Sequence, residues 1–338
     1  MMKRIVFFLI LSVATIGSHR LAAQHFSAEY TTEMQTDFRH AANWVNLLRA
    51  DFTQAASERF HVDLATISIA RTRDERLIDD LQTFSNIEEE NLPLGLAIAG
   101  IRWQGEAHTL FVGIRNMNED YFVSPVTSLF TNSSCGIFPT ISANVPIANY
   151  PLSSFGIHYA FETEHWQFQT TLYNGTGHNR FAGRQNVFRI CPASDGIFSI
   201  LSFNYQNNGS NFNVGTVFLS GMYSETEKAG KMTNAAIWGY AELRISSSFH
   251  ALLQYSANPS QQAACNMYAG AGFLMSCRKA ELGLLSNCAR FAVGDEWATE
   301  GTVKIPLVRT CYLQPALHCI RNGGSWKCVG MLRFGYGL

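Results

Sequence analysis

The chain has 338 residues and a net charge of −1, and only 15 % of its residues are charged, against about 25 % in soluble globular proteins. The near-neutral charge argues against nucleic-acid binding, and the low charge with 12 % aromatic residues is unlike a soluble secreted enzyme. The sequence has no G-x-S-x-G, H-E-x-x-H or P-loop motif, and we predict no catalytic residue, metal site or cofactor.

Residues 1–23 have the pattern of a secretory signal peptide. Lys3 and Arg4 precede an apolar run over residues 5–16, and the small residues Ala22 and Ala23 follow it. That run is shorter than the ~20 residues of a membrane-spanning helix. We expect cleavage near Gln24 and export from the cytoplasm.

Apolar and polar residues alternate through much of the remaining chain. In residues 25–38 the even positions are mostly apolar and the odd positions mostly polar. The same period of two recurs in residues 155–162, 166–172, 212–218 and 249–255. Since successive side chains of a strand point to opposite faces, each segment is predicted to form a strand with one apolar face.

Two features favour a membrane barrel over a soluble sandwich. The polar faces carry many Glu, Gln, Arg and Asn residues, which suit a watery lumen, and aromatic residues gather near predicted strand ends, as in an interfacial belt. These aromatics are Tyr30, Phe38, Trp166, Trp238, Phe249 and Tyr255. We therefore predict one all-β domain over residues 24–338, a transmembrane antiparallel barrel. At ~9–11 residues per spanning strand, about 16 strands fit, with 14 or 18 as alternatives, and such a width leaves an aqueous channel.

Residues 129–156 break this alternation. Pro139, Pro146 and Pro151 cannot serve in the middle of a sheet, while Asn132 and Ser133 offer neutral hydrogen-bonding groups. Irregular backbone is tolerated at membrane depth where it lines a cavity or is buried in protein. We interpret the segment as an inward-folded constriction, with an external loop over the mouth as the alternative.

The neighbouring strand supplies charge beside this segment. In residues 110–115, the apolar Leu110, Val112 and Ile114 are predicted to face lipid, so that Phe111 and Arg115 face the lumen. Mixed charges and aromatic rings are suited to hydroxyl groups and sugar faces, with Phe111 and Tyr121 as stacking candidates. For each of these candidates, the alternative interpretation is an ordinary solvated residue of the barrel wall. The candidate constriction residues are Arg102, Phe111, Arg115, Asn118, Glu119, Asp120, Tyr121, Asn132 and Ser133.

Residues 80–161 contain a string of motifs that resembles the carbohydrate-selective porin (OprB) family. The matching pieces are residues 80–88, 112–118, 120–122, 128–136, 142–146 and 150–152, with fainter similarity in residues 267–277 and 298–324. Asn116, Cys135, His318 and Cys319 depart from the family pattern.

The resemblance implies an outer-membrane barrel of a Gram-negative bacterium that admits sugars to the periplasm by passive, partly selective diffusion. The implied partners are sugars, outer-membrane lipid and the assembly machinery, in a chain that could form a homo-oligomer and binds no nucleic acid. The alternatives are a non-selective barrel, a plugged structural or adhesive barrel, and a barrel-embedded hydrolase.

The C-terminal segment predicts a final hairpin. Leu332, Phe334 and Tyr336 share one face of its last strand. If Gly323-Gly324 form the centre of the turn, Cys319 lies opposite Cys328, and both a disulfide and two neighbouring thiols fit that spacing. A turn centred one residue earlier would place Trp326 opposite Cys319 instead.

Overall fold

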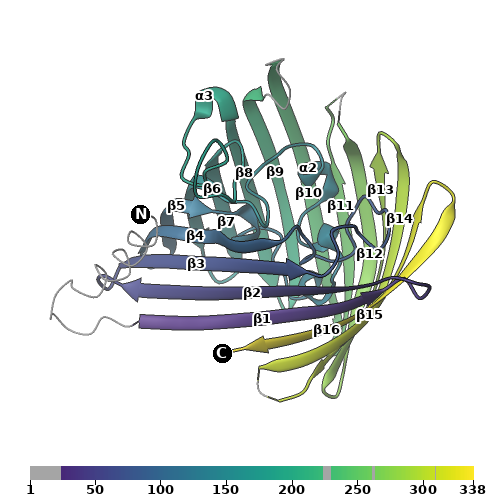
Figure 1. The fold of residues 1–338 in the computed structure, drawn as a ribbon. Coiled ribbons are helices and arrows are strands. Elements are labelled where there is room, and N and C mark those ends of the chain that lie inside the picture. The colour runs from purple at the N-terminus through teal and green to yellow at the C-terminus, as the bar shows by residue number, and fades with distance from the viewer. Residues whose placement is uncertain (1–23, 224–229, 261–262, 309) are drawn as a thin grey trace.

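The computed structural model describes residues 24–223, 230–260, 263–308 and 310–338, so that the predicted signal peptide lies outside the described residues. It is a closed antiparallel barrel in which every strand pairs with its sequence neighbours and β1 pairs with β16 (Figure 1). This confirms the predicted fold class and the strand number of 16. The strands are β1 (Gln24–Thr36), β2 (Ala42–Ala55), β3 (Phe60–Arg71), β4 (Leu92–Gln104), β5 (His108–Arg115), β6 (Ser154–Glu162), β7 (Trp166–Asn174), β8 (Ile197–Asn207), β9 (Ser210–Tyr223), β10 (Gly230–Ser246), β11 (Phe249–Ala257), β12 (Cys265–Cys277), β13 (Ala280–Phe291), β14 (Gly294–Pro306), β15 (Cys311–Asn322) and β16 (Ser325–Gly337).

The side chains of β1 follow the predicted alternation. Phe26 and Met34 are exposed on the outer face, whereas Glu33 and Gln35 are buried on the inner face. Leu332 and Tyr336 of β16 are exposed on the same outer wall, next to β1. Since an apolar outer band and a polar interior alternate in membrane barrels, the apolar face of these strands is the lipid-facing one.

The two ends of the barrel have different connections. The end that holds both termini has short turns such as residues 105–107, 163–165 and 208–209, while the opposite end carries the connections 72–91, 116–153 and 175–196. Short turns are periplasmic and long loops extracellular in outer-membrane barrels. Among the described residues, no helix is long and apolar enough to cross a membrane.

The aromatic belt prediction is wrong for Trp238. Its side chain points into the barrel, where it packs against Phe122 at a ring distance of 5.0 Å. Neighbouring strands also carry apolar inner residues, including Phe198, Ile200 and Leu219. Strands β8–β12 thus carry apolar side chains on the outer face and on part of the inner face. The apolar side chains of the inner face must pack against other residues inside the barrel.

The last hairpin has the predicted register. Gly323 and Gly324 both have positive φ, 66° and 132°, and Cys319 lies directly opposite Cys328. Glycine adopts such φ values without the steric cost that other residues incur. All eight cysteines are free thiols in the structure, including this opposed pair.

Candidate channel constriction

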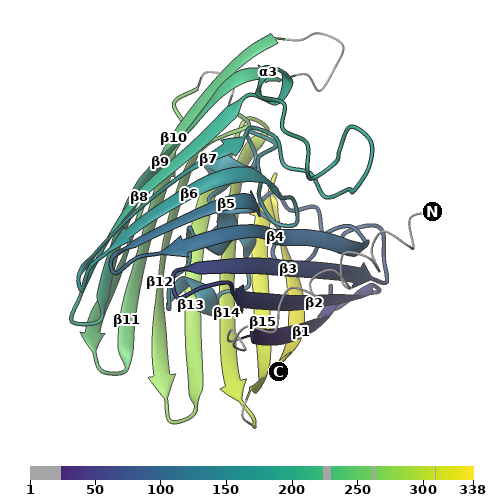
Figure 2. The ribbon, with the colours of Figure 1, turned by 90° about the vertical axis from the view of Figure 1, so that its left-hand side faces the viewer.

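Two of the long connections fold into the barrel. Residues 72–91 join β3 to β4, and residues 116–153 join β5 to β6 through the short helices η1 (Met117–Glu119), η2 (Thr127–Leu129), η3 (Ser133–Cys135) and α2 (Pro139–Ser142). We call these two segments together the inner plug. Figures 1 and 2 show it inside the ring of strands. The predicted inward fold of residues 129–156 is confirmed, but its last three residues already belong to β6 and the plug begins at residue 116. Residues 72–91 are a second inner segment that the sequence did not predict to fold inward.

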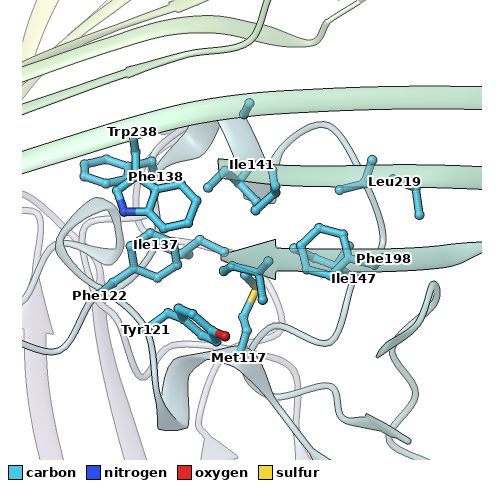
Figure 3. Packing of buried hydrophobic residues seen from close by; sticks show 14 of the residues in the cluster. Met117, Tyr121, Phe122, Ile137, Phe138, Ile141, Ile147, Phe198, Leu219 and Trp238 are labelled. Carbon is cyan, nitrogen blue, oxygen red and sulfur yellow. The ribbon is translucent and has the colours of Figure 1, made fainter. Parts of the chain in front are cut away.

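An apolar seam fixes one side of the inner plug to the wall. Phe138 packs against Tyr268 at a ring distance of 5.3 Å and against Phe122 at 5.6 Å. Figure 3 shows Phe138 close to Trp238 of the wall, and Ile147 of the plug close to Phe198 of the wall. Burying side chains of this size contributes about 1.5–3 kcal/mol each. No solute can pass along this seam, because its side chains fill the space.

Three wall glutamates hold the inner plug by its backbone. Glu300 accepts hydrogen bonds from the amides of Thr131 (2.8 Å) and Asn132 (3.1 Å). Glu296 accepts from the amides of Leu81 (2.7 Å) and Gln82 (2.8 Å). Hydrogen bonds to a charged acceptor contribute about 1.5–3 kcal/mol each.

The third of these glutamates lies on β10. Glu242 accepts from Ser124 Oγ and from the amides of Val126 (3.1 Å) and Thr127 (3.2 Å). The three carboxylates stand on two strands: Glu242 lies on β10, and Glu296 and Glu300 lie four positions apart on the inner face of β14. Each satisfies backbone donors that the irregular plug cannot pair within itself. The inner plug is therefore fixed at several points around the wall.

The two plug segments also bind each other. Asn86 donates its amide to Thr131 O (2.7 Å), and Ser133 donates its amide to Thr83 O (3.0 Å). Ser134 Oγ donates to Gln82 Oε1 at 2.9 Å. These contacts join residues about 50 positions apart into one body inside the barrel.

Two cavities lie on either side of this junction. The one toward the long connections has a volume of about 310 Å³. The one toward the chain termini has about 260 Å³ and is lined by the inner faces of β1, β2 and β14–β16. Asn86 lines both cavities, and its Oδ1 accepts a hydrogen bond from Arg333 Nη2 at 2.5 Å. We identify the surroundings of Asn86 as the candidate constriction.

Inner-wall arginines are compensated by carboxylates. Glu119 receives two hydrogen bonds from the Arg49 guanidinium, at 2.8 and 2.9 Å. Since a cation and an anion at contact cancel each other's field at distance, the path near Asn86 carries little net charge. The pairs are Arg49–Glu119, Arg102–Asp63, Arg115–Asp120 and Arg333–Glu33.

The plug residue Asp80 has an unusual environment. Its Oδ2 accepts from the Phe84 amide at 2.6 Å, while Arg76 stays 3.8 Å from its other oxygen. Burial raises the pKa of this carboxyl to about 6, more than Arg76 can offset. The segment 72–91 thus contains a group that titrates near neutral pH.

The structure divides the nine predicted residues into three groups. Asn118 and Ser133 line the larger cavity, and their contact with a solute remains a prediction. Arg102, Arg115, Glu119 and Asp120 all face the interior, but each is engaged in an ion pair, and Arg102 lies near the terminal end of β4, away from both cavities.

The remaining three residues are buried and cannot contact a passing solute. Phe111 is 1 % exposed beneath the Arg115 guanidinium, 4.7 Å from its ring centre. Tyr121 is 2 % exposed with its hydroxyl 2.7 Å from Thr171 Oγ1, and Asn132 is 1 % exposed. Their predicted contact with solute is wrong, because the barrel wall and the inner plug bury these side chains. Ile114 faces outward as predicted, but other protein atoms cover it.

Sequence reasoning missed Asn86 and the three anchoring glutamates. A usable signal existed for two of them: Glu296 and Glu300 are separated by four residues and share a face of one strand. Acidic residues on the inner face of a strand need a partner or water. The partners here are 169 and 215 positions away in the chain, so that spacing alone could not identify them.

Comparisons with known proteins support the fold. No model of a protein family matches the sequence, and no curated protein matches it. The high-pH structure of Pseudomonas putida OprB has a TM-score of 0.79 to this chain at 11 % identity, covering 93 % of this chain and 94 % of that one. Vibrio cholerae OmpT with its loop L8 deleted has a TM-score of 0.60 at 8 % identity, and a Rhodopseudomonas blastica porin mutant has 0.61 at 8 %. For both, the match covers 94 % of this chain and 100 % of the other. The chain therefore shares the barrel fold of these outer-membrane porins, here with sixteen strands and an apolar outer face.

Proposed function

We propose that this protein is a passive porin that admits carbohydrates to the periplasm through a partly selective constriction beside Asn86. The observation that carries the proposal is a pair of cavities that share this residue in their linings, one toward each end of the barrel. A path of this kind needs no cofactor and no chemical step. Its selectivity would come from width and from the hydrogen-bonding groups along it.

The lining of the larger cavity suits neutral polyols. It presents the side chains of Gln82, Asn86, Asn118 and Ser133 beside the ring of Tyr150. Amides and hydroxyls exchange hydrogen bonds with sugar hydroxyls without requiring a charge on the solute, and an aromatic ring can contact a sugar face. Sugars are therefore the solute class that we assign to the path.

The paired charges support the same assignment. A channel for anions or cations would present a ring of one sign, whereas Arg49 and Arg333 each contact a glutamate at the smaller cavity. Lys304, whose Nζ lies 4.4 Å from the centre of the Tyr312 ring, and Glu29 also line this cavity, and their opposite charges offset each other. We therefore expect little ion selectivity and no exclusion of neutral solutes.

A plugged structural or adhesive barrel is the main rival, because the inner plug fills much of the interior. A non-selective barrel is the second, and a barrel-embedded hydrolase the third. The swelling rate of liposomes that contain the purified protein distinguishes a plugged barrel and a non-selective barrel from a selective porin. We expect swelling in iso-osmotic monosaccharides, slower swelling in disaccharides, and little in larger oligosaccharides. If the liposomes swell in no sugar, the result would support the plugged barrel. If they swell at equal rates in sugars of all sizes, it would support the non-selective barrel.

Assembly is a further part of the proposal. The outward Leu332 and Tyr336 of the last strand, beside the β1–β16 seam, suit recognition by the outer-membrane assembly machinery. A homo-oligomer is also proposed, and the Vibrio cholerae OmpT protein has been solved in a trimer form. Native mass spectrometry of the detergent-extracted protein would give the number of chains.

A further inference from the structure

The connection between β7 and β8, residues 175–196, differs from the inner plug because it crosses the rim of the barrel. Its first part touches the plug: Gly177 donates its amide to Pro146 O at 2.8 Å, and the His178 amide donates to Ser153 O at 2.8 Å. Residues 180–187 then form a tight loop closed by a parallel bridge between Arg180 and Asn186, in which the Val187 amide donates to Arg180 O at 2.8 Å; we refer to this loop as the hairpin. Figure 2 shows this connection, which leads to α3 (Pro192–Asp195), beside the strands β4–β6.

Strand register shows that the hairpin lies on the lipid-facing side of the wall. Arg115 points inward, so its neighbour Ile114 points outward, together with the directly opposed Ala99 and Phe155. Val187 is buried in one cluster with Ile114 and Leu96, against which Ala99 and Phe155 also pack. The hairpin therefore covers the outer face of β4–β6 near the extracellular rim.

The surface that the hairpin presents outward is apolar and aromatic. Phe181 is 45 % exposed and Phe188 is 55 % exposed, with ring centres 6.4 Å apart. Ile190 of the same connection is also exposed. A neighbouring groove of about 1070 Å³ is lined by Phe181 and by Leu94, which is itself exposed on the outer wall. Aromatic side chains at this depth are typical of the lipid–water interface.

The same hairpin is strongly cationic. Residues 175–190 contain three arginines and no acidic residue. Arg189 is paired with Asp195 at 3.1 Å, whereas Arg180 and Arg184 are exposed and have no ion-pair partner among the residues that the structure describes. Glu89 and Glu90 line the far side of the groove, on the plug side of the rim. Two unpaired guanidinium groups thus stand beside exposed aromatic rings.

We propose that residues 180–190 bind a phosphorylated lipid of the outer leaflet. Arg180 and Arg184 would contact its phosphate, because guanidinium groups form two-pronged hydrogen bonds with phosphate oxygens. Phe181 and Phe188 would contact its acyl chains, as a continuation of the lipid-facing wall. A second copy of the chain fits this surface less well, because an isologous contact would bring the same cations together.

Lipid binding can be measured separately from transport. The full-length mature protein, purified in detergent, would be titrated with diphosphorylated lipid A and with its phosphate-free counterpart, and bound lipid counted by native mass spectrometry. The test variant is the double substitution Arg180→Gln and Arg184→Gln. The matched control is Arg39→Gln, which removes an exposed arginine from a turn at the same end of the barrel. Heat-dependent gel mobility would show that each variant is folded.

We expect the double variant to bind diphosphorylated lipid A about 10- to 30-fold more weakly, as the loss of two interfacial arginines implies, and the control to bind like the wild type. Equal binding of the phosphate-free lipid would overturn the phosphate assignment. Unchanged binding by the double variant, or its loss of an oligomeric state that the wild type has, would overturn the lipid assignment. Sugar permeation is expected to be unchanged in every variant, so failure of this proposal leaves the porin proposal standing.

Discussion

Asn86 of the inner plug accepts a hydrogen bond from Arg333 of the last strand at 2.5 Å, and its side chain borders the cavities on both sides of the plug. Arg333 is held in turn by Glu33, whose carboxylate is fully buried. The position of Asn86 is thus fixed by an ion pair on the wall, so that a constriction there would have a defined width.

Replacing Asn86 tests this assignment. Asn86→Leu keeps the volume but removes the amide, and we expect sugar block of the ion current to weaken about tenfold, the effect of one lost hydrogen bond. Asn86→Ala should instead raise the single-channel conductance. Asn322→Leu, at the β15–β16 turn, is the control. Identical behaviour of Asn86→Leu and the control would remove Asn86 from the path.

Arg102 and Arg115 are expected to respond differently to truncation. Arg102→Ala leaves Asp63 unpaired in a partly hydrated position, so the reversal potential in a salt gradient should shift toward cation preference with little loss of stability.

Arg115→Ala leaves Asp120 buried, with His158 at 3.7 Å as its remaining ion-pair partner among the residues that the structure describes. It also exposes the ring of Phe111, which the Arg115 guanidinium covers. We expect destabilisation of about 3 kcal/mol, measured by unfolding in denaturant. Val214→Ala, on the lipid-facing wall, should change neither property. An equal loss of stability in Arg102→Ala and Arg115→Ala would contradict this prediction, which rests on the deeper burial of Arg115.

Glu300 tests the anchoring of the inner plug. Glu300→Ala leaves the amides of Thr131 and Asn132 without their acceptor, at a cost of about 1–3 kcal/mol for each buried donor. The segment 116–153 should loosen, which would be seen as larger and noisier single-channel currents. Glu300→Gln keeps one acceptor oxygen and should lie in between, and the exposed Glu106→Ala should resemble the wild type. A quiet wild-type current in Glu300→Ala would show that the apolar seam alone holds the plug.

Asp80 predicts a pH dependence of stability. Burial raises the pKa of its carboxyl to about 6, above the unfolded value of about 4, so the folded state binds the proton more tightly. Its contribution is therefore fully present below about pH 4 and is lost as pH rises through about 6, a difference of at most about 3 kcal/mol. Asp80→Asn should remove this loss, so that its unfolding temperature exceeds that of the wild type at pH 7 but not at pH 4. The exposed Asp79→Asn is the control, and parallel pH profiles for all three proteins would refute the assignment.

The sequence predicted the wall better than the contents of the barrel. Alternation is a local signal, and it placed Met34 outward and Glu33 inward correctly. The candidate list was less accurate because Phe111 and Tyr121 were assumed to face water. Tyr121 is buried in a cluster with inner-wall residues such as Trp238, whereas Phe111 lies beneath the Arg115 guanidinium. A strand that is apolar on both faces leaves no alternation to detect.

Long-range hydrogen bonds were the other limit. Glu242 binds Val126 and Thr127 across more than 100 positions, and no spacing rule connects them. Ser133 was predicted because neutral polar residues in an irregular segment suit a constriction. Asn86 has the same chemistry, but it lies in a segment that was not expected to fold inward.

Single-channel conductance of the purified protein in a planar bilayer, with graded additions of sugar, tests the central claim most directly. We predict discrete open channels whose current is reduced by small sugars in a concentration-dependent way. The reduction should be weaker in Asn86→Leu and equal to that of the wild type in Val214→Ala. A barrel that inserts, as its resistance to heat and detergent would show, and yet conducts no ions would contradict the account.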